Sequence, residues 1–243
     1  MLKIKYIACA AITLMVVIVL LGGIMVYRHS ITVKMFQMVS NEDTANIEIY
    51  LKRHPWLANS VLDDYWGATG LHMAIYGKNN DMVRLFLNAG ADPNHPYVRD
   101  GMPLQEVCIW GNEEAVDMLL AAGADVNKYE RVETGSGTPL ENACRGGYLP
   151  IVRKLLAHGA QPNLVTYKGP ALQAALDGYE ATWTDRKEII KLLFDHGATI
   201  PTAQSKELQG WSLLRWARFW KAPDDIIALL KQHGATEDGA LEK

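Results

Sequence analysis

The sequence predicts an all-α fold, a solenoid of about six stacked helix-turn-helix units that follows one apolar N-terminal helix. Three observations support this prediction. A five-residue motif, Gly-Ala-Asp/Gln-x-Asn, recurs at residues 90–94, 123–127 and 159–163. Its spacing of 33 and 36 residues is typical of stacked-repeat proteins. A leucine stands 19 residues before each motif, and residues 7–27 form an uncharged run.

The N-terminal segment has the pattern of a membrane anchor. A short tail over residues 1–6 carries two lysines, and residues 7–27 hold no charge. A helix of that length rises about 31 Å, close to the ~30 Å hydrocarbon core of a bilayer. We therefore expect one transmembrane helix over residues 7–27, in contact with the lipid bilayer, and a linker over residues 28–32. A cleaved signal peptide is the alternative, although no small-residue cleavage site follows the run.

Flanking charges suggest the orientation of this segment. The amino terminus, Lys3 and Lys5 precede the run, and only Arg28 and Lys34 follow it closely. Positive charge favours the cytoplasmic side of a membrane. The expectation is a single-pass protein of a bacterial inner membrane with its repeats in the periplasm. Signal-peptide cleavage would instead give a soluble periplasmic protein.

Each unit has the signals of two short helices. Thr138 is a good N-cap, and Pro139 occupies the first helical position, where its missing N–H is not needed. Leu140 and Ala143 are three apart and so share one face of the first helix. The glycine of the motif ends the second helix, and we expect the motif's Asp and Asn to bond their own turn backbone. One pair cannot bury its faces alone, so copies stack.

The blocks before the three motifs carry a family resemblance. Residues 69–74, 102–107 and 138–143 read TGLHMA, MPLQEV and TPLENA. Together with the motifs they resemble the ankyrin repeat, over roughly residues 33–236. The resemblance implies an ankyrin-repeat solenoid whose first helices and turn tips line a concave binding face. It also implies that His72 bonds the turn backbone.

The resemblance divides the chain into units. We expect a repeat domain over residues 33–240, consisting of an N-terminal cap (33–66), repeats at about 67–100, 101–134, 135–167 and 168–208, and a C-terminal repeat (209–240). End units are expected to be atypical, because their outer faces meet water. In the fourth repeat Gly197 stands 25 positions after Leu172, against 19 in the earlier repeats, which predicts a six-residue insertion between its helices.

The histidines and cysteines follow the repeat and therefore have structural explanations. His158, His196 and His233 each precede a repeat-ending glycine, a helix C-terminal position that favours His. Cys108 and Cys144 are 36 residues apart, in equivalent places on neighbouring units. Packed helices lie about 10 Å apart, beyond the ~7 Å that a disulfide spans. We expect free, buried thiols.

No pattern indicates catalysis. The adjacent carboxylates at residues 63–64, 113–114 and 224–225 point in different directions on a helix and make poor acid/base pairs. Nucleophile, metalloprotease, P-loop and dinucleotide motifs do not occur. A net charge of −3 gives no attraction to nucleic acid. We expect no catalytic residue, metal, cofactor, small-molecule substrate or nucleic-acid partner.

The expected binding surface is rich in side chains that are common at interface hot spots. Tyr, Trp and Arg occupy positions expected on the concave side, where an ordinary solvated turn would carry Asp, Lys, Asn and Gly. The predicted partner-binding residues are Tyr76, Tyr97, Arg99, Ile109, Trp110, Tyr129, Arg131, Arg145, Tyr148, Tyr167 and Trp183. The alternative is that each aromatic ring covers its own hairpin. We expect the Trp cluster at residues 211–220 to pack under the C-terminal cap.

The predicted function follows from these elements. We expect a non-catalytic, membrane-anchored protein–protein interaction module that binds a protein partner through its concave face. One alternative is an immunity protein that neutralises a secreted toxic enzyme. Others are an enzyme or a scaffold without a specific partner. Ankyrin-like stacks serve many pathways, so the fold does not name the partner.

Overall fold

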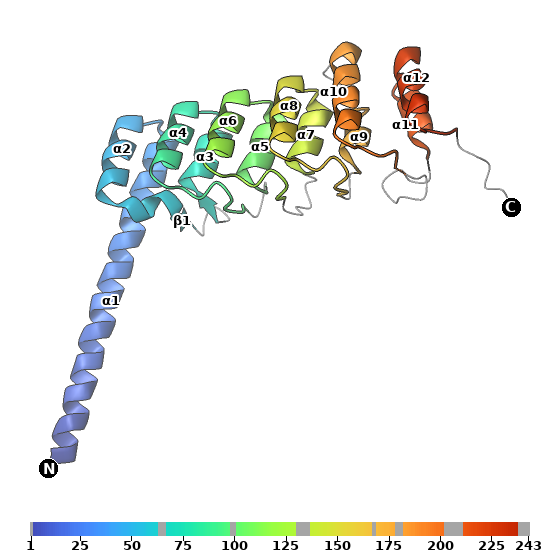
Figure 1. Cartoon of the computed structure of the whole chain (residues 1–243). Helices are drawn as coiled ribbons and strands as arrows, with labels where there is room; N and C mark the ends of the chain where they lie inside the picture. Colours follow the sequence, from blue (N-terminus) through green and yellow to red (C-terminus); the bar gives the residue numbers. More distant parts are fainter. Residues whose placement is uncertain are drawn as a thin grey trace.

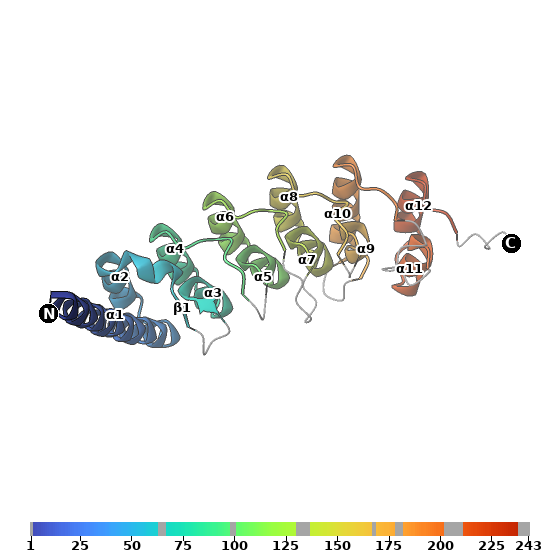
Figure 2. The same cartoon turned by 90° about the horizontal axis from the view of Figure 1, so that it is seen from below.

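The computed structural model describes residues 2–62, 67–97, 101–129, 137–166, 169–177, 182–201 and 211–237, without the side chains of residues 2–19 and Leu62. One long helix leads into a single row of helix pairs (Figure 1). Seen from below, the row forms a gentle arc, with the first helix of each pair on the inner side and the second on the outer side (Figure 2). The solenoid expected from the sequence is therefore the observed architecture.

The elements follow one another in a regular order. The N-terminal unit contains α1 (Leu2–Ser40), α2 (Thr44–Arg53) and the short 3-10 helix η1 (Pro55–Asn59). The first helices of the later units are α3 (Gly70–Tyr76), α5 (Pro103–Trp110), α7 (Pro139–Gly146), α9 (Ala171–Ala174) and α11 (Leu213–Phe219). The second helices are α4 (Asn80–Asn88), α6 (Glu113–Ala121), α8 (Leu149–Ala157), α10 (Trp183–Asp195) and α12 (Asp224–Gln232).

Short backbone ladders join the units at the turn side and make the fold mostly rather than entirely helical. β1 (Val61–Leu62) pairs antiparallel with β2 (Ala68–Thr69), with Val61 opposite Thr69. Single bridges connect Tyr97 to Gly101 and Thr166 to Gly169. Each ladder brings the two ends of a turn together just before the next first helix.

One continuous core runs through the stack. Leu140 and Ala143 of α7 are fully buried, as are Ile151, Val152 and Leu155 of α8, the helix that packs beside α7. The same combination of a large and a small residue on the first helix recurs along the chain, and the core cluster extends from Ile31 to Ala235. This periodic burial explains why the repeats stack in one row.

α1 is a single helix that ends inside the repeat domain. Its last turns bury Ile31 and Thr32, and the guanidinium of Arg28 lies 4.3 Å from the ring centroid of Trp56. The separate linker expected over residues 28–32 was therefore wrong, because those residues already pack on the first unit. α1 thus supplies the first helix of the N-terminal cap.

Among the residues that the structure describes, no helix is both long enough and apolar enough to cross a membrane. The anchor expected over residues 7–27 stays a prediction.

The fourth repeat differs from the expected one. Its first helix, α9, has only four residues, and α10 has 13, whereas α4, α6, α8 and α12 have nine each. Trp183 was expected in an inserted loop, but it is the first residue of α10. The reason is a local cap, since the Thr182 hydroxyl accepts a hydrogen bond from the Asp185 N–H at 3.2 Å. Part of the extra length therefore becomes helix.

The recurring Asp and Asn have different roles. Asp92 Oδ1 accepts from the N–H of Asn94 at 2.8 Å, which is the turn bond that was expected. Asn94 instead reaches the next repeat: its Nδ2 donates to the carbonyl of Gly123 at 2.9 Å, and its Oδ1 accepts from the N–H of Asp125 at 2.7 Å. The expectation that Asn bonds its own turn was wrong. The motif is a clamp between consecutive repeats.

The histidines that precede the repeat-ending glycines lie at helix C-termini, as expected. The ring Nδ1 of His158 is 2.8 Å from the carbonyl oxygen of Lys154, and that of His196 is 2.8 Å from the carbonyl oxygen of Leu192. His233 repeats the contact at 3.0 Å. These rings cap helix-end carbonyls.

Cys108 and Cys144 are free and fully buried, as predicted. Burial raises the pKa of both thiols well above the ordinary value. The thiols are therefore core side chains.

Candidate protein-interaction surface

The inner face of the arc carries apolar side chains that the stack leaves in solvent. Tyr76 ends α3 with 65% of its surface exposed, and Ile109, near the end of α5, is 39% exposed. Leu71 and Ala74 occupy the buried side of α3, so a residue two positions after Ala74 points away from the core. The exposure follows from helix periodicity.

Two aromatic rings meet on this face across a repeat boundary. Tyr76 and Trp110 lie edge to face with their ring centroids 5.7 Å apart. The ammonium of Lys78 lies 5.1 Å from the centroid of the Trp110 ring. Offset and edge-to-face rings attract each other, and a cation is attracted to a ring face. The pair therefore forms an ordered aromatic surface spanning two repeats.

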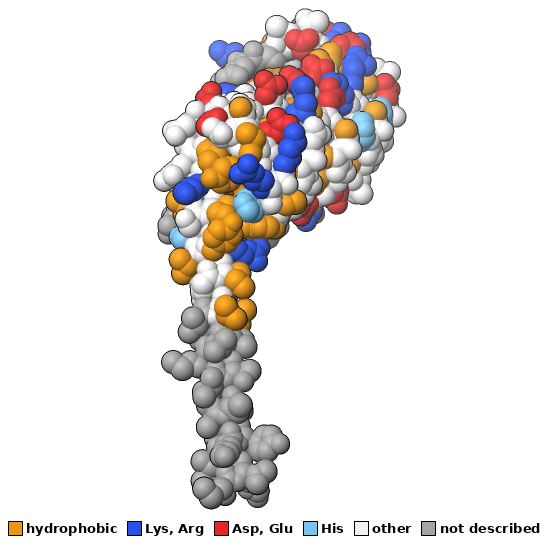
Figure 3. All heavy atoms as spheres, turned by 90° about the vertical axis from the view of Figure 1, so that its left-hand side faces the viewer, with side chains coloured by type: hydrophobic (Ala, Val, Ile, Leu, Met, Phe, Trp, Pro, Cys, Tyr) orange, Lys and Arg blue, Asp and Glu red, His pale blue; other side chains and the backbone are white. Residues whose placement is uncertain are grey.

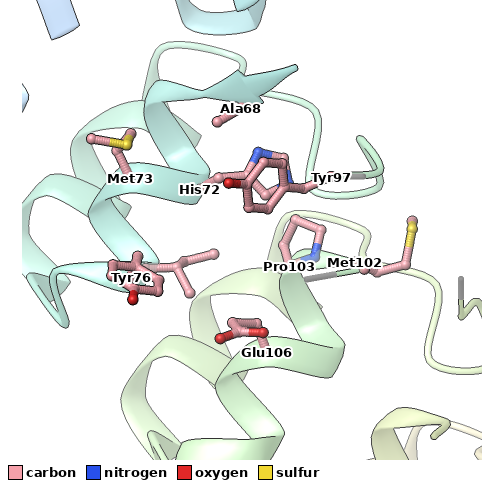
Figure 4. A pocket seen from close by; sticks show the side chains of 10 residues that line it. Ala68, His72, Met73, Tyr76, Tyr97, Met102, Pro103 and Glu106 are labelled. Atoms are coloured by element: carbon pink, nitrogen blue, oxygen red, sulfur yellow. The ribbon is translucent and has the colours of Figure 1, made fainter. Parts of the chain in front are cut away.

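A pocket of about 230 Å³ opens beside this pair, between α3 and α5. Figure 4 shows His72 and Tyr97 on one side of the space and Tyr76 and Glu106 on the other. The lining residues are Ala68, His72, Met73, Ile75, Tyr76, Tyr97, Gly101, Met102, Pro103 and Glu106. Two repeats and the turn between them thus contribute to one cavity.

His72 is a fixed, neutral wall of the pocket. Its Nδ1 lies 2.8 Å from the Thr69 hydroxyl, and its Nε2 lies 3.0 Å from the carbonyl oxygen of His95. The turn-backbone contact implied by the family resemblance is therefore present. Burial, and next the neighbouring His95, lower the pKa of His72 to about 4. The ring is uncharged at neutral pH and cannot supply a proton there.

Two other predicted residues, Arg145 and Tyr148, have partners within the stack. The guanidinium of Arg145 lies 3.4 Å from Asp177 Oδ2, and both side chains are largely buried. The Tyr148 ring packs on Gly111 and Gly146, where an added Cβ would lie 2.6 and 2.2 Å from it. Tyr148 thereby fits the alternative in which an aromatic ring covers backbone.

The remaining predicted residues fall outside this cluster. Trp183 is half-buried at the start of α10, with its ring centroid 5.9 Å from the Arg186 guanidinium carbon. Tyr129 is half-buried at the end of a described segment. Arg99, Arg131 and Tyr167 lie outside the described residues. The structure thus brings three predicted residues together, Tyr76, Tyr97 and Trp110, and Ile109 precedes Trp110 on α5.

The repeat pattern matches a known family. The family model for ankyrin repeats in three copies matches residues 35–130 and 101–166, more than half of the chain. This chain belongs to the ankyrin-repeat family. Ankyrin repeats are protein–protein interaction modules, and proteins built from them are generally non-catalytic.

Relatives of this ankyrin-repeat chain come from distant organisms. An ankyrin repeat protein of fowlpox virus is 30% identical over 142 residues, which are 58% of this chain and 30% of the relative. Zygote-specific protein 3 of Chlamydomonas reinhardtii is 40% identical over 91 residues, 37% of this chain and 24% of the relative. The chain spans less than a third of the length of these curated relatives.

The fold also matches a solved ankyrin-repeat domain. That of human ASB11 superimposes with a TM-score of 0.60 at 20% identity, covering 83% of this chain and 84% of the other. At this identity the match concerns the fold alone.

Sequence reasoning missed two important residues of this ankyrin-repeat stack. Glu106 stands two positions after Leu104, where the neighbouring repeats carry Met73 and Asn142. The sequence signal that could have identified Glu106 is an acidic residue at a position where the neighbouring repeats carry none. Arg186 was also missed: it is fully buried and donates to the carbonyls of Ala175 and Arg145 at 2.5 and 3.2 Å.

Proposed function

We propose that this ankyrin-repeat chain is a non-catalytic interaction module that binds a protein partner through the inner face of the arc. The supporting observation is the difference between the two faces. The inner face exposes Tyr76 and Ile109, and the partly buried Trp110 lies beside Tyr76. Clustered aromatic side chains are the common anchors of protein interfaces.

The outer face is occupied by contacts between repeats. Second helices are joined by ion pairs: Arg84 lies 2.5 Å from Glu114, and Lys187 lies 2.5 Å from Asp225. Lys154 bridges to Glu113 and Asp117 at 2.8 and 2.6 Å. These charged groups face water and one another, so a partner gains less by covering them.

Photo-cross-linking tests this proposal. A p-benzoylphenylalanine residue at position 76 or 109 of the full chain, expressed in its own cell type, is expected to give the same cross-linked partner. Matched probes at Arg84 and Asp117, on α4 and α6, are expected to give none. Equal cross-linking from both faces, or an adduct only from the outer probes, would contradict the inner-face assignment. A toxic enzyme as the adduct would support the alternative in which this chain is an immunity protein.

A membrane anchor at the N-terminus is part of the proposed function. α1 exposes large apolar side chains on all sides before it reaches the repeats: Leu20, Leu21, Ile24, Met25, Val26 and Tyr27 are 52% to 72% exposed. Figure 3 shows hydrophobic side chains on α1 where it leaves the repeats, with Lys, Arg and His beside them. A helix that is apolar all round is stable in a bilayer or within protein, not in water.

Fractionation tests the anchor. We expect the chain to stay with membranes after an alkaline carbonate wash, and a variant with Leu21→Asn and Met25→Asn to be released more readily. Reporter fusions after residue 32 and after residue 243 are expected to be active on the periplasmic side. Recovery of the unaltered chain in the soluble fraction would contradict the anchor and leave the inner-face proposal unaffected.

A further inference from the structure

We propose that the N-terminal cap carries a membrane-interface collar, a band of aromatic, basic and aliphatic side chains that lies in the headgroup layer of a lipid bilayer. This assignment rests on the membrane anchor of the proposed function, because it names the surface of the repeat domain that meets the same bilayer. The occupant of this surface is phospholipid. The collar consists of Tyr27, Arg28, Tyr50, His54, Trp56 and Val61.

The aromatic and basic side chains of the collar meet although they come from separate segments. The ring of Tyr27 on α1 has its centroid 6.3 Å from that of His54, which follows α2. The His54 ring lies 6.3 Å from the Tyr50 ring and 6.2 Å from the Trp56 ring on η1. The guanidinium of Arg28 lies over the Trp56 ring, 4.3 Å from its centroid. A chain of neighbouring rings therefore connects the long helix to the body of the cap.

The collar lies where the exposed apolar surface of α1 ends. The large side chains within residues 20–27 are 52% to 72% exposed and cover all sides of the helix. Arg28 and His29 follow directly and are exposed, and Ile31 is already buried in the cap. From Tyr27 to Ile31 the helix rises only about 6 Å. A partner helix would cover one stripe of such a surface, whereas lipid surrounds it, so the collar marks the expected edge of the bilayer.

The residue types of the collar are those that favour a membrane–water interface. Trp and Tyr are enriched at that level, because each has an apolar body and a polar group at one end. An arginine can lay its stem along the rings and keep its charge among the headgroups, as the stacking of Arg28 on Trp56 allows. Val61 on β1 is 40% exposed. An exposed apolar side chain gains free energy when it enters the boundary between headgroups and acyl chains.

A hollow of about 310 Å³ opens within the collar. Arg28, His29, Trp56, Asn59 and Val61 are among the residues that line it. The hollow thus brings a guanidinium, a carboxamide, an aromatic ring and an aliphatic side chain to one opening. A phospholipid headgroup has matching parts, a phosphate for the guanidinium and glycerol and upper acyl carbons for the apolar groups. The collar therefore offers a place for a headgroup as well as a surface.

The arrangement of the helices allows the collar and the inner face to act together. Figure 1 shows α1 leaving the row on the side that carries the turns and β1, and Figure 3 shows hydrophobic, basic and His side chains together where it leaves. The inner face of the arc points across the direction of α1 rather than along it (Figure 2). A bilayer around α1 would therefore meet the collar and leave the inner face open to a protein partner.

Fluorescence quenching in vesicles tests the collar. The full chain, with Cys9→Ala so that only the buried Cys108 and Cys144 remain, is reconstituted into phosphatidylcholine vesicles with or without a nitroxide on the lipid headgroup. A bimane fluorophore is attached through Val61→Cys or, as a matched control, through Ile109→Cys, because the two native side chains are 40% and 39% exposed. We expect the headgroup nitroxide to quench the label at position 61 strongly and the label at position 109 little.

Two tryptophan variants separate the collar from the anchor. Trp56→Ala removes the central ring, so we expect quenching at position 61 to fall toward the value at position 109 while the chain still floats with the vesicles. Trp110→Ala removes a half-buried ring of the inner face and is expected to leave quenching at position 61 unchanged. If Trp56→Ala does not fold, Arg28→Ala serves instead, because Arg28 is exposed, and it is expected to reduce the quenching.

Several outcomes would overturn the collar. They are equal quenching at positions 61 and 109, equal losses in Trp56→Ala and Trp110→Ala, or shielding of the label at position 61 by a second copy, seen as a concentration dependence of its emission in detergent micelles. A chain that floats with the vesicles without quenching at position 61 would count against the collar alone. A chain that does not float would count against the anchor and the collar together, and neither result would affect the inner-face cross-links.

Discussion

Asn127 joins two consecutive repeats through both ends of its carboxamide. Its Nδ2 donates to the carbonyl of Gly159 at 3.0 Å, and its Oδ1 accepts from the N–H of Gln161 at 2.8 Å. Asn59, Asn94 and Asn163 each form the same pair of bonds to the unit that follows their own. The turn side of the stack is therefore held by a regular series of side-chain clamps.

Removing one clamp is expected to weaken the stack. Asn127→Ala loses two hydrogen bonds and should lower the free energy of unfolding by about 1–2 kcal/mol. Asn127→Asp keeps the acceptor but places a second carboxylate oxygen against the carbonyl of Gly159, so it should also be destabilising. Denaturant unfolding of the full chain measures both. As a control, Asn46→Ala removes only a local bond to Asp43. Equal losses for Asn127→Ala and Asn46→Ala would contradict the clamp.

Glu141 is expected to make stability depend on pH. Its Oε2 accepts from the N–H of Thr138 and the hydroxyl of Thr166, and its Oε1 is buried with no hydrogen-bond partner among the described residues. Burial raises the pKa of Glu141 from 4.5 to about 7, more than the bonds from Thr166 and Thr138 lower it. The folded protein thus binds a proton at the Glu141 carboxylate more tightly than the unfolded chain does.

The sign of the effect follows from that difference. The contribution of Glu141 to folding stability is fully present below pH 4.5 and is lost as the pH rises through about 7. Gln occupies the equivalent positions 105 and 173, so Glu141→Gln should fit. Above pH 7 the variant is expected to be more stable than the natural chain by up to ~3 kcal/mol. Unfolding between pH 5 and pH 8 measures this, and parallel pH profiles would exclude it.

Gly111 is expected to tolerate substitution less well than other glycines of the same conformation. Its φ is 69°, and an added Cβ would lie 2.6 Å from the Tyr148 ring. Gly123 has a φ of 87° and nothing within 4 Å of the added atom. Gly123→Ala should therefore cost about 1 kcal/mol, from strain alone. Gly111→Ala should cost at least about 1 kcal/mol more, because the ring must move.

Thermal unfolding of the two glycine variants measures that difference. In a chain that already carries Tyr148→Ala, Gly111→Ala should lower the free energy of unfolding about as much as Gly123→Ala does, because the obstructing ring is gone. Equal destabilisation by the two single substitutions would show that the ring adjusts freely.

The buried thiols are expected to be unreactive. Burial raises the pKa of Cys108 and Cys144, so the reactive thiolate is scarce in the folded chain. Iodoacetamide should label neither residue in native buffer and both in denaturant. Peptide mass analysis without a reductant should find no bond between them. Labelling of Cys108 in the native chain at the rate of an exposed thiol would contradict this.

Local patterns were sufficient for the repeat itself. Thr138 accepts a hydrogen bond from the Glu141 N–H at 3.1 Å, as its N-cap position predicted. The histidines before the repeat-ending glycines contact carbonyl groups four residues earlier. These interactions join residues within one or two helical turns. Their geometry follows from residue order alone, so it could be predicted from the sequence.

Interactions between repeats could be predicted only in part. Tyr148 was expected on the binding face, yet its ring packs on Gly111 of the preceding unit. Arg145 was expected on the binding face, yet its guanidinium pairs with Asp177. In the latter case the partner lies 32 residues away, and a repeat period does not show which side chain of the neighbouring unit will be nearest.

The sequence by itself determined the helix pairs, their period and the buried leucines, since each depends on residues close together in the chain. It also determined the free thiols, because the repeat period places Cys108 and Cys144 on neighbouring helices that are too far apart for a disulfide. Only the tertiary structure decided that Asn127 reaches the next repeat, that α1 continues into the first unit, and that Tyr97 and Glu106 line one pocket. The physical reason is that stacking sets the distance between equivalent side chains of neighbouring units. That distance depends on how the whole row packs.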